Sequence, residues 1–262
     1  MNEPENPVGV ASSRNLPALS ALQRMSSVYT APSRTFTDIL HGYGKWWEPI
    51  IIMLVCFAIY FGAVTQKITW QTVGENNMRN LPAFAQKMMD RLPEEQRKAQ
   101  AEKAPASARI KALCEPGIIV VIDLIAAAVL FGTIKLGFGG KTTFGRVFLV
   151  TLYAGLVLWP LRWLLSAIVI YAGYDPELFN INNPAPTNIA AFFQMSNMSM
   201  GLYTLLSAID VLQLWVLIVT SIGLATVAGV KRSSGYAAVF GWWAIMTLVG
   251  LGFAFATAAI LG

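Results

Sequence analysis

Charged residues are scarce in this 262-residue chain. They make up 13% of the sequence, whereas 55% of the residues are hydrophobic. Soluble domains carry roughly 25% charged residues, so this composition indicates a polytopic membrane protein. The net charge is +5, but nine of the 19 lysines and arginines fall between Lys67 and Lys111. We assign these cations to membrane loops and expect no nucleic-acid partner, which would need a basic face on a soluble domain.

Histidine and cysteine are nearly absent. His41 is the only histidine, and Cys56 and Cys114 are the only cysteines. A two-histidine metal site, a histidine-based catalytic triad and a disulfide framework are therefore excluded. The turn GFGGKT is not a phosphate-binding loop, because Lys135 stands where that motif requires its first glycine. We expect no enzymatic activity, no metal and no cofactor.

Long apolar runs are the main feature that the sequence does contain. Two runs, 118–138 and 144–171, are each long enough to cross a bilayer, and the short basic turn GFGGKTTF joins them. Further runs at about 47–65, 205–230 and 236–261 bring the predicted spans to five. The sequence therefore predicts an all-α membrane domain over residues 31–262, with the lipid bilayer as its surroundings.

The segments around the first span carry weaker patterns. Residues 1–30 lack periodicity and are expected to form a disordered tail. The stretch from Pro32 to Lys45 is predicted to form a short amphipathic helix, whose apolar face we expect on the membrane surface. That face carries Phe36, Ile39 and Leu40.

Prolines set the expected breaks in the helices. Residues 66–117 have a helix-forming composition, and their four prolines predict two or three short helices rather than one long helix. These prolines are Pro82, Pro93, Pro105 and Pro116. Pro160 predicts a kink within the third span. Between the third and fourth spans, the stretch from Met195 to Tyr203 is interpreted as a short interfacial or re-entrant piece.

Basic residues predict the orientation. The short connections around Lys141 and at Lys231-Arg232 are basic, whereas residues 172–205 contain no lysine or arginine. The positive-inside rule then places the N-terminus in the cytoplasm and the C-terminus outside. The basic segment 66–117 would lie outside, but at this length the rule loses force.

Three charged residues fall inside the predicted spans. Counting 1.5 Å per residue from the outer surface places Asp210 at about 6 Å, Asp123 at about 9 Å and Arg162 at about 13 Å depth. Unpaired, each would cost about 2.5–3.5 kcal/mol at the bilayer centre, so we expect the three to meet and pair. A structural clamp between spans two, three and four is favoured over a proton or substrate pathway, because only Ser166 and Gln213 could extend such a pathway.

Small residues recur on the last span. Gly250, Ala254, Ala258 and Gly262 follow one another at every fourth position and share one helix face. Small side chains let helices approach closely, which favours helix association in a membrane. The stripe could pack against a neighbouring span or against a second copy of the chain.

The order of these features resembles the Yip1 domain family in its bacterial branch. The likeness covers roughly residues 31–258 and rests on three blocks: PSRTF at 32–36, GGKTTFGRVFLVTLYAGLVLWP at 139–160 and AIDVLQLWVLIVTSIGLATVAGVKRSSGYA at 208–237. The resemblance implies a five-helix membrane protein with a cytosolic N-terminus. Eukaryotic relatives act in vesicle transport and bind Rab-type GTPases. We do not extend that interaction to this chain, because its N-terminal tail is short and lacks aromatic, acidic motifs.

Two functions remain open at this point. The first is a non-enzymatic membrane scaffold or organiser that acts through helix–helix and protein–protein contacts, with a second copy or another membrane protein as its partner. The second is a small transporter or channel that uses Asp123, Arg162 and Asp210. In a bacterium, either would be a multi-pass protein of the cytoplasmic, or inner, membrane.

Overall fold

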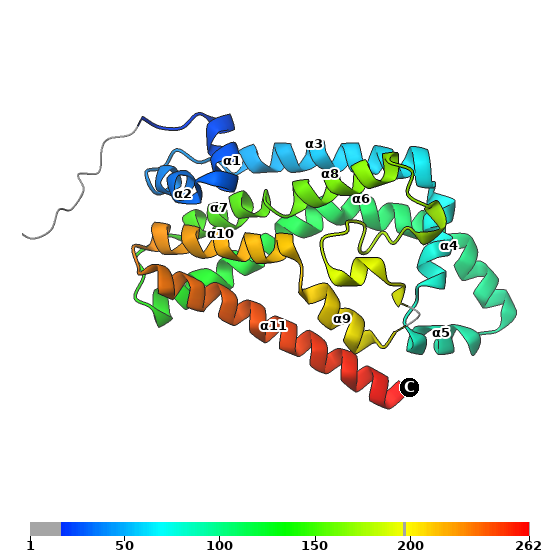
Figure 1. Ribbon diagram of the computed structural model, residues 1–262. Helices are drawn as coiled ribbons and strands as arrows, with labels where there is room; N and C mark the ends of the chain where they lie inside the picture. Colours follow the sequence, from blue (N-terminus) through cyan, green and yellow to red (C-terminus); the bar gives the residue numbers. More distant parts are fainter. Residues whose placement is uncertain (1–16, 196–197, 262) are drawn as a thin grey trace, which may run out of the picture.

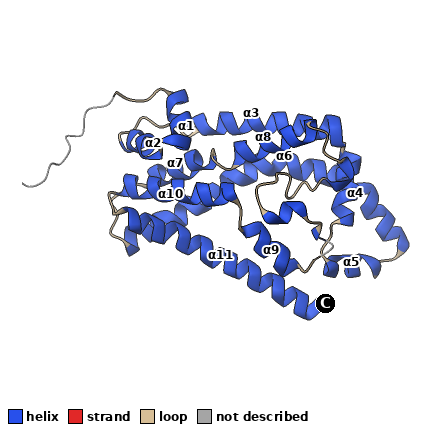
Figure 2. Cartoon of the chain, in the orientation of Figure 1, coloured by secondary structure: helices blue, strands red, loops and turns tan. Residues whose placement is uncertain are grey.

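The computed structural model describes residues 17–195 and 198–261, and every regular element in these residues is a helix (Figure 1; Figure 2). Within this part of the chain, five helical segments are long and apolar enough to cross a membrane. They are Trp47–Ile68, Glu94–Gly137, Phe144–Tyr171, Val211–Ala228 and Arg232–Thr257. The predicted all-α class with five spans is confirmed.

The spans form a bundle in which the third span is central. Helix α3 (Trp47–Ala63) packs along α8 (Trp159–Tyr171), and α6 (Glu94–Gly132) packs along α7 (Phe144–Gly155). Helix α10 (Val211–Ala228) contacts both α7 and α11 (Arg232–Leu261). In Figure 1, α11 leaves the bundle at an angle, so its two halves have different neighbours.

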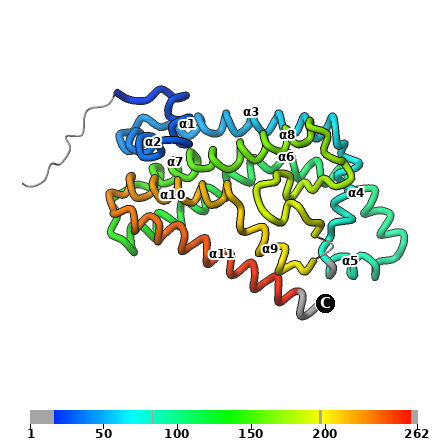
Figure 3. Tube along the Cα trace, viewed as in Figure 1, coloured from blue at the N-terminus to red at the C-terminus, as the bar shows by residue number. Residues whose placement is uncertain are grey.

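The bundle has two distinct ends, which the chain trace of Figure 3 makes easy to follow. We call the end with α1 (Ala21–Thr30), α2 (Pro32–Leu40) and the turns at 138–143 and 229–231 the N-terminal end. We call the other end, with α4 (Trp70–Arg79), α5 (Ala83–Asp90) and the segment 172–210, the loop end. The chain finishes at the loop end, as an odd number of spans requires.

The N-terminal segment forms helix α1 over Ala21–Thr30, so the expected disordered tail is wrong for these residues. Helix α1 begins with a capping box, in which Ser20 and Gln23 each bond the other's backbone N–H. Its Val28 is fully buried. Sequence periodicity missed this helix because tertiary contacts, not an apolar stripe, hold it in place. Residues 1–16 lie outside the described part of the chain.

The apolar face of α2 packs into the protein, so its expected place on the membrane surface is wrong. Phe36 and Ile39 are buried, and α2 contacts α10. The Phe36 ring lies over Gly223, where an added Cβ would come within 2.8 Å of it. The missing side chain at Gly223 provides the site into which the ring fits.

Two of the four expected proline breaks are observed and two are not. Pro82 and Pro93 precede the first residues of α5 and α6. Pro105 and Pro116, however, lie inside the continuous 39-residue helix α6, so the expected breaks there are wrong. The backbone of α6 at Pro105 lies against Gly74 of α4, where an added Cβ would be 2.6 Å from the Pro105 nitrogen. This packing holds α6 helical although Pro105 donates no backbone hydrogen bond.

The third span is interrupted near Pro160, as expected. Helix α7 ends at Gly155, and α8 begins at Trp159 with Pro160 in its first turn. The Leu156 carbonyl in the interruption accepts a 2.6 Å hydrogen bond from the Tyr29 hydroxyl. A side chain of α1 therefore satisfies a backbone group that the interruption frees.

The fourth span begins later than expected. Residues 200–208 form a separate helix, α9 (Met200–Ala208), and α10 begins at Val211, so the predicted start at 205 is wrong. Asp210 stands between the two helices and caps α10. Helix α9 overlaps the stretch interpreted as an interfacial or re-entrant piece, and it packs against the second half of α11.

Candidate functional site: a polar cavity beside the Arg162–Asp210 ion pair

Arg162 and Asp210 form an ion pair that ties α8 to the start of α10. The Arg162 Nη2 atom lies 2.9 Å from Asp210 Oδ2, with the Asp210 side chain only 2% exposed. Asp210 reaches this position because the chain breaks between α9 and α10 instead of continuing as one helix.

The carboxylate of Asp210 is fully occupied. Its Oδ1 accepts hydrogen bonds from the backbone N–H groups of Leu212 and Gln213, which makes it the N-cap of α10. Its Oδ2 accepts from Thr187 Oγ1 at 2.6 Å and from Asn188 Nδ2 at 3.2 Å, besides Arg162. Burial alone would raise the pKa of Asp210, but these bonds and the Arg162 charge hold the pKa below its ordinary value.

The guanidinium of Arg162 is only partly occupied. Its Nη2 binds Asp210, whereas its buried Nε has no hydrogen-bond partner. The Trp159 ring lies 5.5 Å from the Arg162 Cζ atom, in position for a cation–π contact. Ser166, one of the two residues that could extend a polar pathway, instead donates to the Arg162 carbonyl on its own helix.

Asp123 does not join the ion pair. Its Oδ2 atom is buried without a hydrogen-bond partner and lies 3.6 Å from the position of a Cβ added at Gly155. Its backbone carbonyl accepts from the Thr151 hydroxyl at 3.3 Å. Gly155 precedes Arg162 by seven residues, so Asp123 faces the end of α7 rather than the guanidinium. The structure thus brings two of the three predicted residues together.

Asparagines of the segment 172–199 form a hydrogen-bonded framework next to the ion pair. The side-chain amides of Asn183 and Asn188 bond each other in both directions, at 3.1 and 2.9 Å. Asn180 and Asn183 also donate to the Tyr203 hydroxyl of α9, at 3.3 and 3.4 Å. The sequence did not predict a site here, because amides carry no charge or metal-ligand spacing that would mark one.

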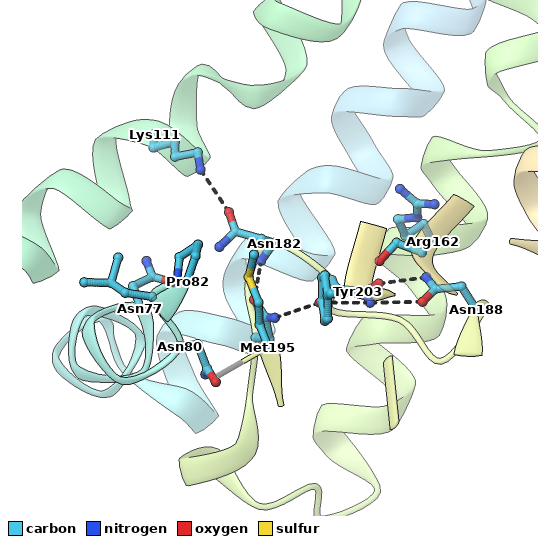
Figure 4. A pocket seen from close by; sticks show the side chains of 13 residues that line it. Asn77, Asn80, Pro82, Lys111, Arg162, Asn182, Asn188, Met195 and Tyr203 are labelled. Atoms are coloured by element: carbon cyan, nitrogen blue, oxygen red, sulfur yellow. Dashed lines mark hydrogen bonds between the residues drawn. The ribbon is translucent and has the colours of Figure 1, made fainter. Parts of the chain in front are cut away.

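This framework encloses one side of a cavity of about 530 Å³ at the loop end (Figure 4). Lys111 of α6 and Arg162 of α8 both line it, and the Lys111 Nζ atom donates to Asn182 Oδ1 at 2.9 Å. The other polar residues of the lining are neutral: Asn77, Asn80, Asn180, Asn182, Asn183, Asn188, Tyr203 and Ser207. Among the described residues, no carboxylate lines the cavity, and its two cations are Lys111 and Arg162, of which Arg162 is paired with Asp210.

A second buried ionic network, at the N-terminal end, was not predicted. Arg24 Nε lies 3.0 Å from Asp38 Oδ2, and Arg24 Nη1 lies 2.6 Å from Glu48 Oε2. Arg24 Nη2 donates to the Leu19 carbonyl at 2.9 Å, and the Tyr153 hydroxyl donates to Glu48. Burial tends to lower the pKa of Arg24, but its bonded partners raise the pKa overall. No sequence pattern marked this network, because Arg24 lies in a segment without helical periodicity.

The small-residue stripe of α11 is buried at one position, Ala254, near the contact between α11 and α9. Ala254 is buried, and the neighbouring Phe255 ring comes so close to Gly201 of α9 that an added Cβ would lie 2.5 Å from it. A Cβ added at Gly250 would meet no other atom within 4 Å. The side chain of Ala258 and all of Gly262 lie outside the described residues.

Among the residues that the structure describes, no cluster of three histidine, cysteine, aspartate or glutamate side chains could hold a metal ion. Comparison with known proteins gives no match among curated proteins or among solved structures. The model of the Yip1 domain, in contrast, matches residues 26–254, which include all five apolar spans except the last residues of the fifth. The chain therefore belongs to the Yip1 domain family.

Proposed function

We propose that this protein is a non-enzymatic membrane scaffold that binds other membrane proteins, or a second copy of itself, through its last span. The observation that carries the proposal is the exposed apolar face of α11. Only 17% of this span's apolar window is buried in the protein, compared with 22% for the span that contains α6 and 67% for the span that contains α7 and α8. Large side chains at helical spacing form the exposed face: Trp242, Ile245, Met246, Val249 and Phe253.

The charged groups of the spans also favour a scaffold. Asp210 is bonded on both oxygens by fixed donors, so it acts as a helix cap and a tie between helices. A proton or substrate pathway needs a chain of exchangeable polar groups. Asp123 lies apart from the pair, and Ser166 bonds its own helix. The predicted clamp therefore reduces to Arg162 and Asp210, between α8 and α10.

The proposal is tested by cysteine cross-linking in the native membrane, followed by native mass measurement in mild detergent. Cys56 and Cys114 are first replaced by alanine, and Met246→Cys then places one thiol on the exposed face of α11. Ile125→Cys on α6, another exposed apolar position, is the matched control. A disulfide-linked product or stoichiometric partner adduct at position 246 but not 125 supports the scaffold. A monomer without adducts at either position contradicts it.

A second candidate function, a small transporter or channel, is favoured by one observation. The cavity at the loop end reaches Arg162, so a polar solute entering there would contact a charge within the bundle. Reconstitution in liposomes tests this function. Flux of ions or small solutes that Arg162→Gln abolishes would support it, and equal leakage in empty and protein-containing liposomes would contradict it.

We further propose that the N-terminal end lies in the cytoplasm and that, in a bacterium, the membrane is the cytoplasmic one. Support comes from the cations at that end: Arg34, Lys45, Lys141, Arg146, Lys231 and Arg232. Arg232 donates to Ser33 at 3.1 Å, which joins the turn after α10 to α2 on the same side. A reporter that is active only in the cytoplasm should give a signal when it is fused to the N-terminus and none when it is fused to the C-terminus.

A further inference from the structure

We propose that the cavity at the loop end binds the phosphate group of a phospholipid, with an acyl chain lying in the apolar groove that opens beside it. This inference is independent of the proposed scaffold, because none of the residues that line the cavity belongs to α11. It rests on three observations: the charge of the cavity, its unpartnered donors and its connection to lipid-facing residues.

The charge of the cavity selects an anion. Lys111 and Arg162 are the charged residues among those that line it, and the remaining polar groups are amides and hydroxyls. Asp210 does not line the cavity, and its oxygens are occupied by five donors. An incoming anion therefore meets Lys111, the Asp210-paired Arg162 and several neutral donors, and among the described residues of the lining no carboxylate opposes it.

The donors at the cavity are incompletely satisfied. Buried polar atoms in proteins almost always have a hydrogen-bond partner, so an exception indicates a missing one. Two such atoms belong to residues that line this cavity, namely Arg162 Nε and Ser207 Oγ. Both atoms are buried, so a phosphate oxygen would accept from them only after the side chains of the lining shift.

An apolar groove of about 290 Å³ adjoins the cavity, and Lys111 and Arg162 line both. The rest of the groove is largely apolar and includes Ile118 and Ile122 of α6, whose side chains are 50% and 52% exposed. These two residues lie on the apolar part of α6, which faces lipid in a membrane. A soluble anion would gain nothing from this groove, whereas an acyl chain would bury apolar surface in it.

The heights of the residues match a lipid at the membrane interface. Lys111 precedes Ile118 by seven residues on the same helix, which places it about 10 Å farther toward the loop end. A phosphate at Lys111 and an acyl chain at Ile122 thus follow the direction of a lipid in the bilayer. Glu115 lines the groove between them and interacts electrostatically with Arg162 and Lys111, so it offsets part of the charge of both cations.

The experiment measures binding of dioctanoyl phosphatidylglycerol to the full-length protein after delipidation in mild detergent. Lys111→Gln removes one cation from the cavity, and we expect it to weaken binding about tenfold, the effect of one charge-assisted hydrogen bond. Lys103→Gln is the matched control, because Lys103 is exposed on the same helix and does not line either site. Ile122→Ala should weaken binding more than Ile125→Ala, which removes an exposed side chain outside the groove.

Two further probes distinguish the sources of the signal. Dioctanoylglycerol has the acyl chains without the phosphate, and inorganic phosphate has the anion without the chains. We expect neither to displace the phospholipid at equal concentration. Displacement by inorganic phosphate would show a site for free anions, displacement by dioctanoylglycerol would show an unspecific apolar site, and equal effects of Lys111→Gln and Lys103→Gln would remove the cavity from the binding. Each of these results overturns the proposal.

Discussion

Each end of the bundle holds an arginine that is ion-paired with a buried carboxylate, and the two arginines are used differently. At the N-terminal end, Arg24 is 4% exposed, and its Nε, Nη1 and Nη2 atoms all donate to protein acceptors. At the loop end, Arg162 is 23% exposed, its Nη2 binds Asp210, and its Nε has no partner. The first arginine closes a network that is complete within the chain, whereas the second lines a cavity and has a buried Nε atom for which the described residues provide no partner.

This difference separates stability from binding. When the fold provides every partner of a buried charge, no ligand is needed to satisfy that charge. Such a pair does not by itself make the protein more stable than apolar residues would at the same positions. A buried donor without a partner has a free-energy cost that a ligand can remove. We therefore regard the N-terminal end as structural and the loop end as the site of ligand contact. Four predictions test this comparison.

The largest expected effect is at Arg24. Arg24→Met leaves Asp38 and Glu48 in a buried site without their cation, which should lower the free energy of unfolding by about 3–5 kcal/mol. Thermal unfolding in mild detergent, followed by tryptophan fluorescence, measures the loss. Arg34→Met, at an exposed arginine on α2, is the control. Equal losses in the two variants would show that the Arg24 network is not the structural tie described above.

The next effect compares close packing at the two ends. An added Cβ at Gly235 would lie 2.3 Å from the Ser221 carbonyl oxygen, whereas at Gly201 it would meet the Phe255 ring, a side chain that is 56% exposed. Backbone cannot yield and an exposed ring can turn, so Gly235→Ala should cost about 1–3 kcal/mol and Gly201→Ala less. The same unfolding assay measures both.

Gly241→Ala serves as the control for this pair, because it lies on the same helix as Gly235 and an added Cβ meets no other atom within 4 Å. It should be neutral or stabilise the helix by up to about 1 kcal/mol. A larger loss for Gly201→Ala than for Gly235→Ala would mean that the loop end, rather than the N-terminal end, is the more rigidly packed.

A smaller loss is expected at Arg162. Arg162→Leu removes the cation, but Asp210 keeps four neutral donors, so the free energy of unfolding should fall by only about 1–2 kcal/mol. Adding Asp210→Asn removes the remaining charge and preserves a capping side chain, and the double variant should be more stable than Arg162→Leu alone. Equal instability of the single and double variants would exclude a clamp between these two residues.

The smallest expected effect is that of Asp210 on how the stability of the protein depends on pH. Burial by itself raises the pKa of Asp210, but its hydrogen bonds and the charge of Arg162 lower the pKa below its ordinary value. Because the folded pKa is depressed, this stabilisation is present above the unfolded pKa and is lost as the pH falls through the folded pKa. Unfolding of the wild type and of Asp210→Asn, compared from about pH 6 down to about pH 3, should show a steeper loss in the wild type. Parallel curves would contradict this.

The two ends were not equally predictable. At the loop end, the depths of Arg162 and Asp210 could be counted along apolar runs, and the cost of an unpaired charge in a membrane predicted their pairing. The same count failed for Asp123, since depth alone does not say which way a side chain points around its helix. At the N-terminal end, Arg24 lies in a polar segment, where a charge is unremarkable in sequence. Only the packing of α1 against α2 and α3 makes it buried.

Local rules for proline show the same limit. Pro82 and Pro93 precede helix starts, as their fixed geometry favours. Pro105 and Pro116 lie within α6, because contact with Gly74 of α4 at Pro105 and the surrounding span hold the helix across them. The prolines have the same intrinsic preference at all four positions, and their neighbours in space decide between a break and a continuous helix.

The sequence by itself determined that the chain enters a membrane and crosses it five times, because no other solvent accepts apolar runs of that length and spacing. It also determined the family, through the order of those runs and the blocks between them. Tertiary structure decided which charges are neutralised, which side chains approach glycines and where a cavity remains. Those outcomes depend on the rotation of each helix about its axis and on contacts between residues far apart in the sequence, such as Tyr29 and Leu156, which are 127 positions apart.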